Sequence, residues 1–204
     1  VGLALPLIAL QYHEVKVILE HEFGKYFETN GRNKLYADYI YLDTDERRRF
    51  AQISHEYLIE QLQHTGIEQI TQDSTSKKIE VNYNHPVKAL HWVIQDNRYI
   101  DSDKTKLSLN TAASEHGNQL LRYETVNINA TTDRRDTFQT MSMQLNGHDR
   151  FTSRNSDYFR NVQNYQHNSI NPQKHIYTYS FSLKPEEHQP SGSCNFSRID
   201  NATM

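Results

Sequence analysis

Short tracts in which apolar and polar residues alternate run through most of this chain, and this spacing predicts β-strands with one buried face. The clearest tract is residues 175–183, where an aromatic or aliphatic residue occupies every second position. The dipeptides Asn30-Gly31 and Asn146-Gly147 add turn signals that are typical of hairpins. The predicted strands are residues 5–10, 12–19, 35–42, 67–71, 78–83, 88–95, 119–128, 137–145 and 175–183.

Three stretches between these tracts are predicted as loops. Residues 96–118 and 148–174 are polar, and the second carries aromatic residues only at intervals, which predicts an excursion on the surface. Residues 185–201 contain prolines and a glycine and are predicted to form a structured loop. Many short strands joined by polar turns and long loops are typical of a sandwich or jelly roll.

One stretch, residues 42–63, has the three- and four-residue spacing of an amphipathic helix. Asp43 or Thr44 can cap its first turn, and Gly66 supplies a stop signal. A second start at Ser54 would instead make the segment a turn followed by a helix. Because strands are predicted on both sides, the helix is interpreted as a connector between two β units. Its predicted buried face consists of Phe50, Ile53, Tyr57, Leu58 and Leu62.

The composition favours an all-β protein. Of the 204 residues, 36% are hydrophobic, 13 are tyrosine and only 7 are glycine. A formal net charge of −3 provides no basic field that would attract nucleic acid or an anionic membrane. The single cysteine, Cys194, cannot form an internal disulfide, which is consistent with a reducing compartment. The apolar opening, residues 1–10, is too short to span a bilayer and is predicted as buried strand.

Histidines and the cysteine do not form a recognisable chemical site. The histidines lack the spacing of a metal site, so each is predicted to be satisfied by the protein or exposed. Cys194 and His188 lack an orienting Asn or Asp, which favours a small packed cysteine over a nucleophile. The histidines considered are His13, His55, His85, His91 and His188.

The charged residues are explained in the same way. Asp43 with Asp45, and Glu186 with Glu187, are close neighbours that suit a cap and solvated charge better than an acid–base pair. The run 47–49, three arginines, is flanked by acidic residues and is predicted to be a salt-bridged helix face. Without a Gly-rich phosphate loop either, we predict no catalytic, cofactor-binding or metal residue and no enzyme.

Asn-x-Ser/Thr sequons occur at Asn129, Asn195 and Asn201. At this asparagine content such sequons arise by chance, and modification requires access to the glycosylation machinery. Unmodified asparagine is the default, and glycosylation at each position stays open.

Five passages together resemble the major capsid proteins of the nucleocytoplasmic large DNA viruses, such as phycodnaviruses, iridoviruses and mimiviruses. They occur in the family's order and span almost the whole chain. The passages are GLALPLIALQYHEVKV (2–17), YADYIYLDTDERRRFAQISHEYLIEQLQ (36–63), NHPVKALHWVIQ (84–95), LNGHDRF (145–151) and PEEHQPSGSCNFSRIDNA (185–202).

The resemblance implies a double jelly roll, in which two eight-stranded sandwiches share one polypeptide. On that plan, residues 1–42 are the last strands of the first jelly roll and residues 43–64 are a helical linker. Residues 65–204 are most of the second jelly roll, truncated before its last strands. We therefore expect an internal piece of a longer protein, which alone would be aggregation-prone or would pair its first strands into the vacancy left in the second unit.

The resemblance also implies a structural function: homotrimers form pseudo-hexagonal capsomers and build the icosahedral shell of a virion assembled in the host cytoplasm. Minor capsid proteins are implied partners and an inner viral membrane is implied nearby, with no direct contact to nucleic acid. Two other functions stay open: a carbohydrate- or receptor-binding β-sandwich, and a viral scaffold protein of the same fold. The residues expected at domain or subunit contacts are 47–49, Tyr57, Trp92 and Phe151, although Trp92 fits a core position equally well.

Overall fold

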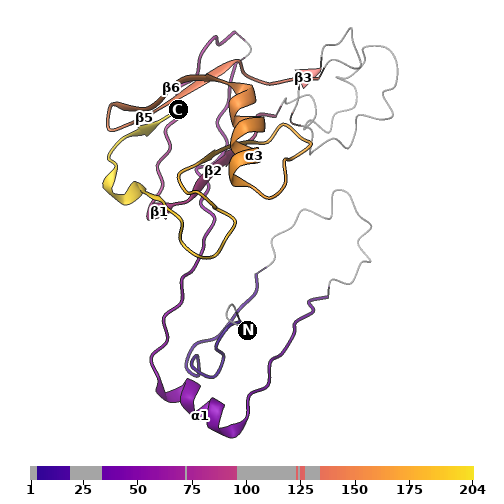
Figure 1. Ribbon diagram of the computed structural model, residues 1–204, viewed down its shortest axis with the longest axis vertical. Coiled ribbons are helices and arrows are strands. Elements are labelled where there is room, and N and C mark those ends of the chain that lie inside the picture. Colours follow the sequence, from indigo (N-terminus) through magenta and orange to yellow (C-terminus); the bar gives the residue numbers. More distant parts are fainter. Residues whose placement is uncertain (1–3, 19–33, 72, 96–122, 124, 127–133) are drawn as a thin grey trace. The chain divides into compact units, whose positions relative to one another are not determined.

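The structure is a computed structural model that describes residues 4–18, 34–71, 73–95, 123, 125–126 and 134–204. The chain divides into two compact units, Val1–Gln61 and Leu62–Met204, which are described separately. Figure 1 shows strands and short helices gathered in the second unit. The described part of the first unit contains the helix α1, turns and extended backbone.

Helix α1 spans Thr44–Gln52 and begins where the sequence predicts. The backbone of Asp43 is extended, and its carboxylate Oδ1 accepts a hydrogen bond from the Glu46 amide at 3.0 Å. That bond satisfies one of the first-turn amides that have no partner inside the helix, so the predicted cap is confirmed.

The helix predicted over residues 42–63 is wrong beyond Gln52, and no helix begins at Ser54. Ile53 is already extended, with φ −96° and ψ 140°. The His55 ring nitrogen Nε2 lies 2.8 Å from the Phe50 carbonyl oxygen, and the two rings stack with centroids 5.0 Å apart. Because the last carbonyls of a helix lack partners, this contact favours an early end. The helical spacing of apolar residues therefore continues past Gln52, although the helix itself ends there.

We expect Asp43→Ala to destabilise α1 locally by about 1 kcal/mol, because the Glu46 amide loses its acceptor. Hydrogen exchange of the α1 amides measures this directly. Asp45→Ala is the matched control, since Asp45 is 91% exposed and its ion pair with Arg48 is long, at 3.8 Å. The control is expected to cost a few tenths of a kcal/mol, and equal effects would contradict the cap.

The predicted strand over residues 5–10 is wrong, because this apolar run folds into turns. The Ala9 amide donates to the Pro6 carbonyl at 2.9 Å, and the His13 amide to the Leu10 carbonyl at 3.0 Å. A short apolar run has no periodicity that separates a strand from a compact turn, and Pro6 has a φ angle suited to starting one.

The tracts predicted as strands over residues 12–19 and 35–42 have no ladder partner among the described residues. Their side chains are accordingly open to solvent, with Tyr12 at 96% and Tyr41 at 91% exposure.

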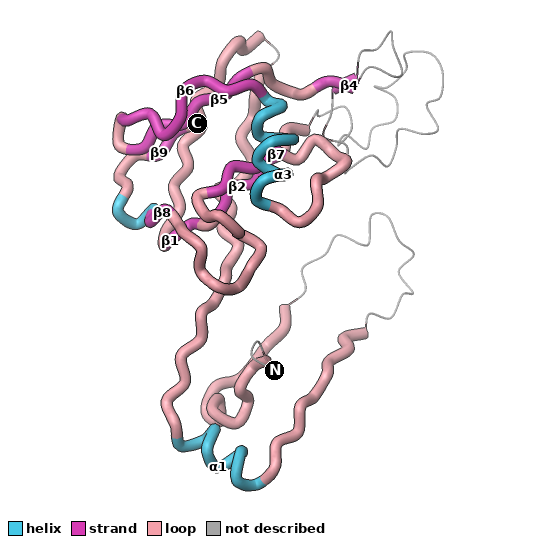
Figure 2. Tube along the Cα trace, viewed as in Figure 1, coloured by secondary structure: helices cyan, strands magenta, loops and turns pink. Residues whose placement is uncertain are grey.

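In the second unit, β5 (Thr140–Leu145) and β6 (His148–Asn155) form an antiparallel hairpin. Asn146 and Gly147 both have positive φ, 51° and 79°, so the predicted turn is confirmed. β9 (Ala202–Thr203) pairs with the other edge of β5, and Glu80 adds a bridge to Thr203. Figure 2 shows this three-stranded sheet, β6-β5-β9.

Three further antiparallel pairs complete the described strands. β2 (Ala89–Trp92) pairs with β7 (Tyr177–Ser180), and the two strands lie within the predicted tracts 88–95 and 175–183. The other pairs are β1 (Pro86–Val87) with β8 (Cys194–Asn195) and β3 (Thr125–Val126) with β4 (Arg134–Arg135).

The remaining predicted elements differ in outcome. Residues 67–71 form no strand, whereas residues 78–83 contribute the Glu80 bridge and backbone hydrogen bonds to residues 202–204. Residues 185–201 contain β8 and a 3-10 turn, Phe196–Arg198, so the structured loop is confirmed. Asn30-Gly31, residues 96–118 and most of 119–128 lie outside the described residues.

The surface excursion predicted over residues 148–174 is wrong. This stretch forms β6, a π-helical turn η3 (Tyr158–Val162) and helix α3 (Gln163–His167). Phe159 is completely buried, and so is Asn164, whose amide donates to the carbonyls of Arg160 at 2.7 Å and Ile176 at 3.2 Å. Polar composition misled the prediction because these buried amides are satisfied by hydrogen bonds inside the fold.

The core of the second unit consists of two adjoining clusters. The aliphatic cluster is centred on Met143, which has no exposed surface. The aromatic cluster is centred on Phe159 and Tyr177, which are equally buried. Trp92 and Phe151 pack against both clusters and join them. The buried members of the aliphatic cluster are Val81, Leu90, Met143, Phe196 and Ala202, and those of the aromatic cluster are Phe159, Tyr177 and Tyr179.

Candidate functional site

Two of the residues expected at domain or subunit contacts, Trp92 and Phe151, are partly buried and pack against the core of the second unit. The Trp92 ring meets Phe159 edge-on at a centroid distance of 5.4 Å. The Phe151 ring packs on Tyr179 at 4.7 Å. Their side chains therefore stabilise the second unit, and a contact role for either residue stays a prediction.

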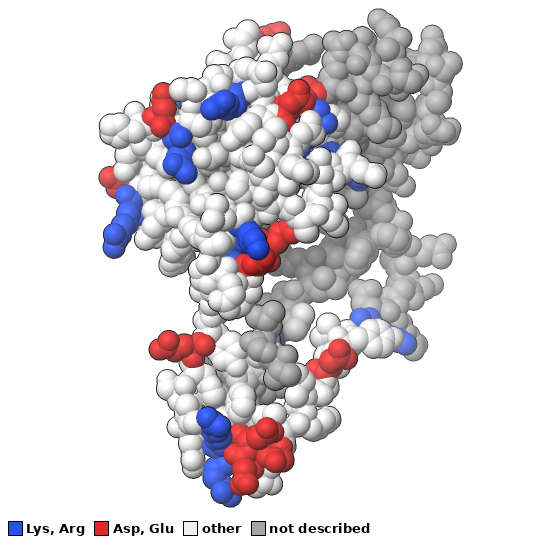
Figure 3. Space-filling model, viewed as in Figure 1, with Lys and Arg blue, Asp and Glu red and all other residues white. Residues whose placement is uncertain are grey.

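The arginine run 47–49 lies on α1 and is exposed. Figure 3 shows acidic side chains beside these basic ones, and Arg48 approaches Asp45 at 3.8 Å. The local charge is thus balanced, as the sequence predicts. Tyr57 is 44% exposed. A contact role for Tyr57 and for the arginine run stays a prediction.

The histidines are placed apart from one another in the described chain. His91 Nδ1 lies 3.0 Å from the Thr178 hydroxyl. Desolvation lowers the pKa of His91, and the negative charge of Glu186, which would raise the pKa, only partly offsets this effect. The His85 amide donates to the Ser197 hydroxyl at 2.7 Å. Among the described residues, no three His, Cys, Asp or Glu side chains come together as a metal site would require.

Cys194 packs at the edge of the aliphatic cluster, opposite Val87 in the ladder. Burial raises the pKa of its thiol, which disfavours the reactive thiolate. This placement agrees with the prediction that Cys194 is a small packed residue.

The neighbouring carboxylates take structural roles. Glu186 accepts a hydrogen bond from the Ser169 amide at 2.9 Å, and Glu187 pairs with Lys184 at 2.9 Å. Of the sequons, Asn195 and Asn201 are exposed, whereas Asn129 lies outside the described residues. The Asn195 side chain accepts from the Ser197 amide at 3.1 Å. Modification of any of the three stays open.

A polar cluster that sequence reasoning missed lies beside the aromatic core. Asp136 is at its centre, with a side chain only 15% exposed. Arg160 Nε lies 2.8 Å from Asp136 Oδ1, the Tyr177 hydroxyl donates to the same oxygen at 2.9 Å, and His175 Nε2 is 3.6 Å away. The cluster ties η3 and β7 to the segment before β5. The other members lie 24 to 41 residues from Asp136 in the sequence, so no local motif could reveal the cluster.

The cluster shifts the pKa values of its members. Burial alone would raise the pKa of Asp136, but hydrogen bonds from Tyr177 and Arg160, with the charges of Arg160 and His175, outweigh burial and lower it. Burial is the main cause that raises the pKa of Tyr177 to about 12. Asp136 is therefore ionised and Tyr177 protonated at neutral pH.

We expect the second unit to lose stability in acid through Asp136. Because the folded-state pKa lies below the unfolded value of about 3.9, the contribution is complete above that value and is lost as pH falls through the folded pKa. Urea denaturation of the full-length protein between pH 6 and about pH 2.5 measures this. The Asp136→Asn variant should show a flatter acid limb, and an unchanged slope would contradict the assignment.

The first unit exposes many large apolar side chains for a protein surface. Tyr36 is 82% exposed and Ile18 is 79% exposed. Single exposed apolar residues are ordinary, whereas this many large ones is unusual for a protein surface. The more exposed members are Leu5, Tyr12, Val17, Ile18, Leu35, Tyr36, Tyr39, Tyr41 and Ile59. No described helix is long and apolar enough to cross a bilayer.

Comparisons with known proteins agree with this picture. A family model described as large eukaryotic DNA virus major capsid protein matches residues 46–204. The major capsid protein of Pyramimonas orientalis virus is 46% identical, over all of this chain and 50% of the relative. That of Paramecium bursaria Chlorella virus 1 is 42% identical, again over all of this chain and 50% of the relative.

Solved structures give the same result. A quasi-atomic structure of the PBCV-1 virus capsid matches with a TM-score of 0.62 and 40% identity, covering 81% of this chain and 41% of that one. The Faustovirus major capsid protein matches with a TM-score of 0.50 at 13% identity, over 64% of this chain and 27% of that one, and supports the fold alone.

The fold is sheet-dominated with few helices and matches solved viral capsid structures, which places it in the viral jelly-roll class. The chain belongs to the family of large eukaryotic DNA virus major capsid proteins. It spans about half the length of the curated relatives it matches.

Proposed function

We propose that this chain is part of a major capsid protein that forms homotrimers and builds the icosahedral shell of a large DNA virus. The main support for this proposal is that the chain is 46% identical, along its entire length, to a major capsid protein. A structural match to a virus capsid at 40% identity adds to it. In this proposal the protein resides in the virion, is assembled in the host cytoplasm and contacts minor capsid proteins, with an inner membrane nearby.

The proposal includes a double jelly roll. Residues 1–42 supply the last strands of the first jelly roll, residues 43–64 the linker, and residues 65–204 most of the second. The division of the chain at Gln61 and Leu62 falls within the proposed linker and supports it. The linker is then α1 followed by extended chain, rather than one long helix.

The exposed apolar side chains of the first unit fit the same proposal. Tyr12 and Tyr36 lie on segments that lack ladder partners among the described residues. In a longer protein, further strands pair with these segments and cover the apolar faces. Burial of such surface also supplies the affinity that a closed trimer requires.

Electron microscopy of the full-length protein tests the proposal. We expect three-fold particles with a hexagonal outline, in which each subunit contains two sandwiches. Isolated monomers at micromolar concentration would contradict trimer formation. Trimers with a single sandwich per subunit would contradict the double jelly roll while leaving the assembly intact.

A further inference from the structure

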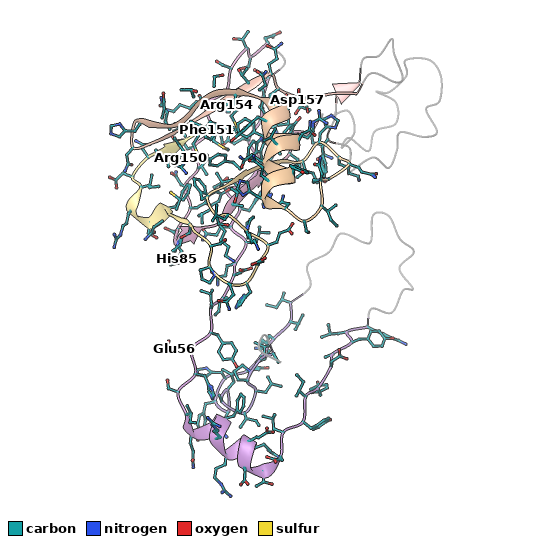
Figure 4. All side chains as sticks on the ribbon, in the orientation of Figure 1. Glu56, His85, Arg150, Phe151, Arg154 and Asp157 are labelled. Atoms are coloured by element: carbon teal, nitrogen blue, oxygen red, sulfur yellow. The ribbon has the colours of Figure 1, made fainter. Side chains whose placement is uncertain are left out.

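The second unit has a hollow of about 580 Å³, open to solvent, between the end of β6 and η3. We propose that this hollow binds a neutral saccharide. The inference does not depend on shell formation. The polar side chains that line the hollow are Ser153, Arg154, Asn155, Asp157 and Asn161, and Tyr158 lies among them. Figure 4 shows Arg154 and Asp157 near the start of the helical segment.

The aromatic wall of the hollow is fixed from behind. The Tyr158 hydroxyl accepts a hydrogen bond from Gln163 Nε2 at 2.9 Å. Gln163 is itself buried, and its Oε1 accepts from the Ser180 amide on β7 at 3.0 Å. The Tyr158 ring also meets Phe159 edge-on at 5.2 Å. A ligand therefore meets a side chain whose position is already set, which reduces the entropy lost on binding.

The acidic wall is fixed in a similar way. Asp157 Oδ1 accepts from Arg160 Nη2 at 2.8 Å, and Arg160 is held by Asp136. The other oxygen, Oδ2, makes no hydrogen bond to the described part of the chain. The Arg154 guanidinium carbon lies over the Tyr158 ring, 5.5 Å from the ring centre.

The remaining polar groups have unused hydrogen-bonding capacity. The side chains of Ser153, Asn155 and Asn161 make no hydrogen bond to the residues that the structure describes. An amide offers a donor and an acceptor side by side, a carboxylate accepts two hydroxyls, and a guanidinium donates in pairs. Adjacent hydroxyls of a sugar ring present the complementary pairs.

The charge balance selects a neutral ligand. Arg154 brings one positive charge to the hollow and Asp157 one negative charge. Phosphate or sulfate recognition favours several cations, and a carboxylate on the wall opposes an anion. The hollow also has an apolar part, since Val162 lines it and is 41% exposed. The C–H face of a sugar packs on such a surface.

The test uses the full-length protein on an array of neutral, sialylated and sulfated glycans, followed by titration calorimetry of the neutral glycan that binds best. Heparin and inorganic phosphate are the anionic probes. We expect neutral glycans to bind, and Asn161→Ala and Asn155→Ala each to weaken binding by about 3- to 10-fold, as the loss of a hydrogen bond predicts. Asn82→Ala, at an exposed asparagine outside the hollow, should bind as the parent does.

Four results would overturn the inference. They are no glycan binding at millimolar concentration, unchanged affinity in Asn161→Ala, a preference for sulfated glycans that Arg154→Ala abolishes, and a neighbouring copy that fills the hollow in the assembled particle. Circular dichroism confirms that each variant is folded. Because particle formation is scored separately by microscopy, failure of glycan binding and failure of shell assembly are distinguishable.

Discussion

Replacing Phe159 by alanine is expected to lower the free energy of unfolding of the second unit by about 3–5 kcal/mol. The side chain has no exposed surface. Its ring lies 5.4 Å from the rings of both Trp92 and Phe151, which come from β2 and β6. Because separate elements converge on this one ring, no single shift can close the cavity that alanine would leave.

Urea denaturation of the full-length protein, with hydrogen exchange of the β7 amides to locate the effect, measures the loss. Tyr165→Ala is the matched control, because Tyr165 lies on the same helical segment and is 83% exposed. The control is expected to change stability by no more than about 0.5 kcal/mol. A loss below about 1 kcal/mol for Phe159→Ala would show that the aromatic cluster is not packed as described.

The sequence predicts strands well where a strand packs against the core. β2, β5 and β7 all fall inside predicted tracts. The Asn146-Gly147 turn is equally local, since two residues with positive φ suffice to define it. In such places, periodicity and turn chemistry contain the information that determines the structure.

The polar stretch 148–174 shows where composition misleads. A hydropathy pattern assigns the polar residues Gln163 and Asn164 to the surface. In the structure both are buried, and the side-chain amide of each bonds to a backbone group more than ten residues further along the chain. The aromatic residues that occur at intervals, such as Phe159, are the anchors of this segment rather than exceptions to a surface loop. Satisfaction of buried polar groups depends on tertiary partners, which the sequence does not display.

The sequence did not predict the structure of the first unit or the candidate sites, and the reason is related. Alternation over residues 12–19 and 35–42 indicates two-faced segments, but the partner of an extended segment is a long-range property. The Asp136 cluster and the hollow beside Tyr158 are likewise assembled from separate elements. The arrangement of these sites in space, and not a motif, is what identifies them.

Asp136→Asn is expected to destabilise the second unit by about 3 kcal/mol, because the substitution leaves the Arg160 guanidinium without its main counter-charge. Both side chains are largely withdrawn from water, 15% exposed for Asp136 and 27% for Arg160, so solvent screens the pair weakly. Lys184→Met is the matched control. Its ion pair with Glu187 has the same kind of geometry, 2.9 Å, but is 67% and 57% exposed, and its loss should cost less than about 0.5 kcal/mol.

A double-mutant cycle decides whether the pair itself accounts for the loss. Arg160→Met alone should also be destabilising, since it removes the guanidinium that lies 2.8 Å from the largely buried Asp136 carboxylate. The double variant should then be less destabilised than the sum of the two single variants, by about 0.5–3 kcal/mol. Additive losses, measured by urea denaturation at pH 7, would mean that Asp136 and Arg160 stabilise the fold through separate contacts and not as an ion pair.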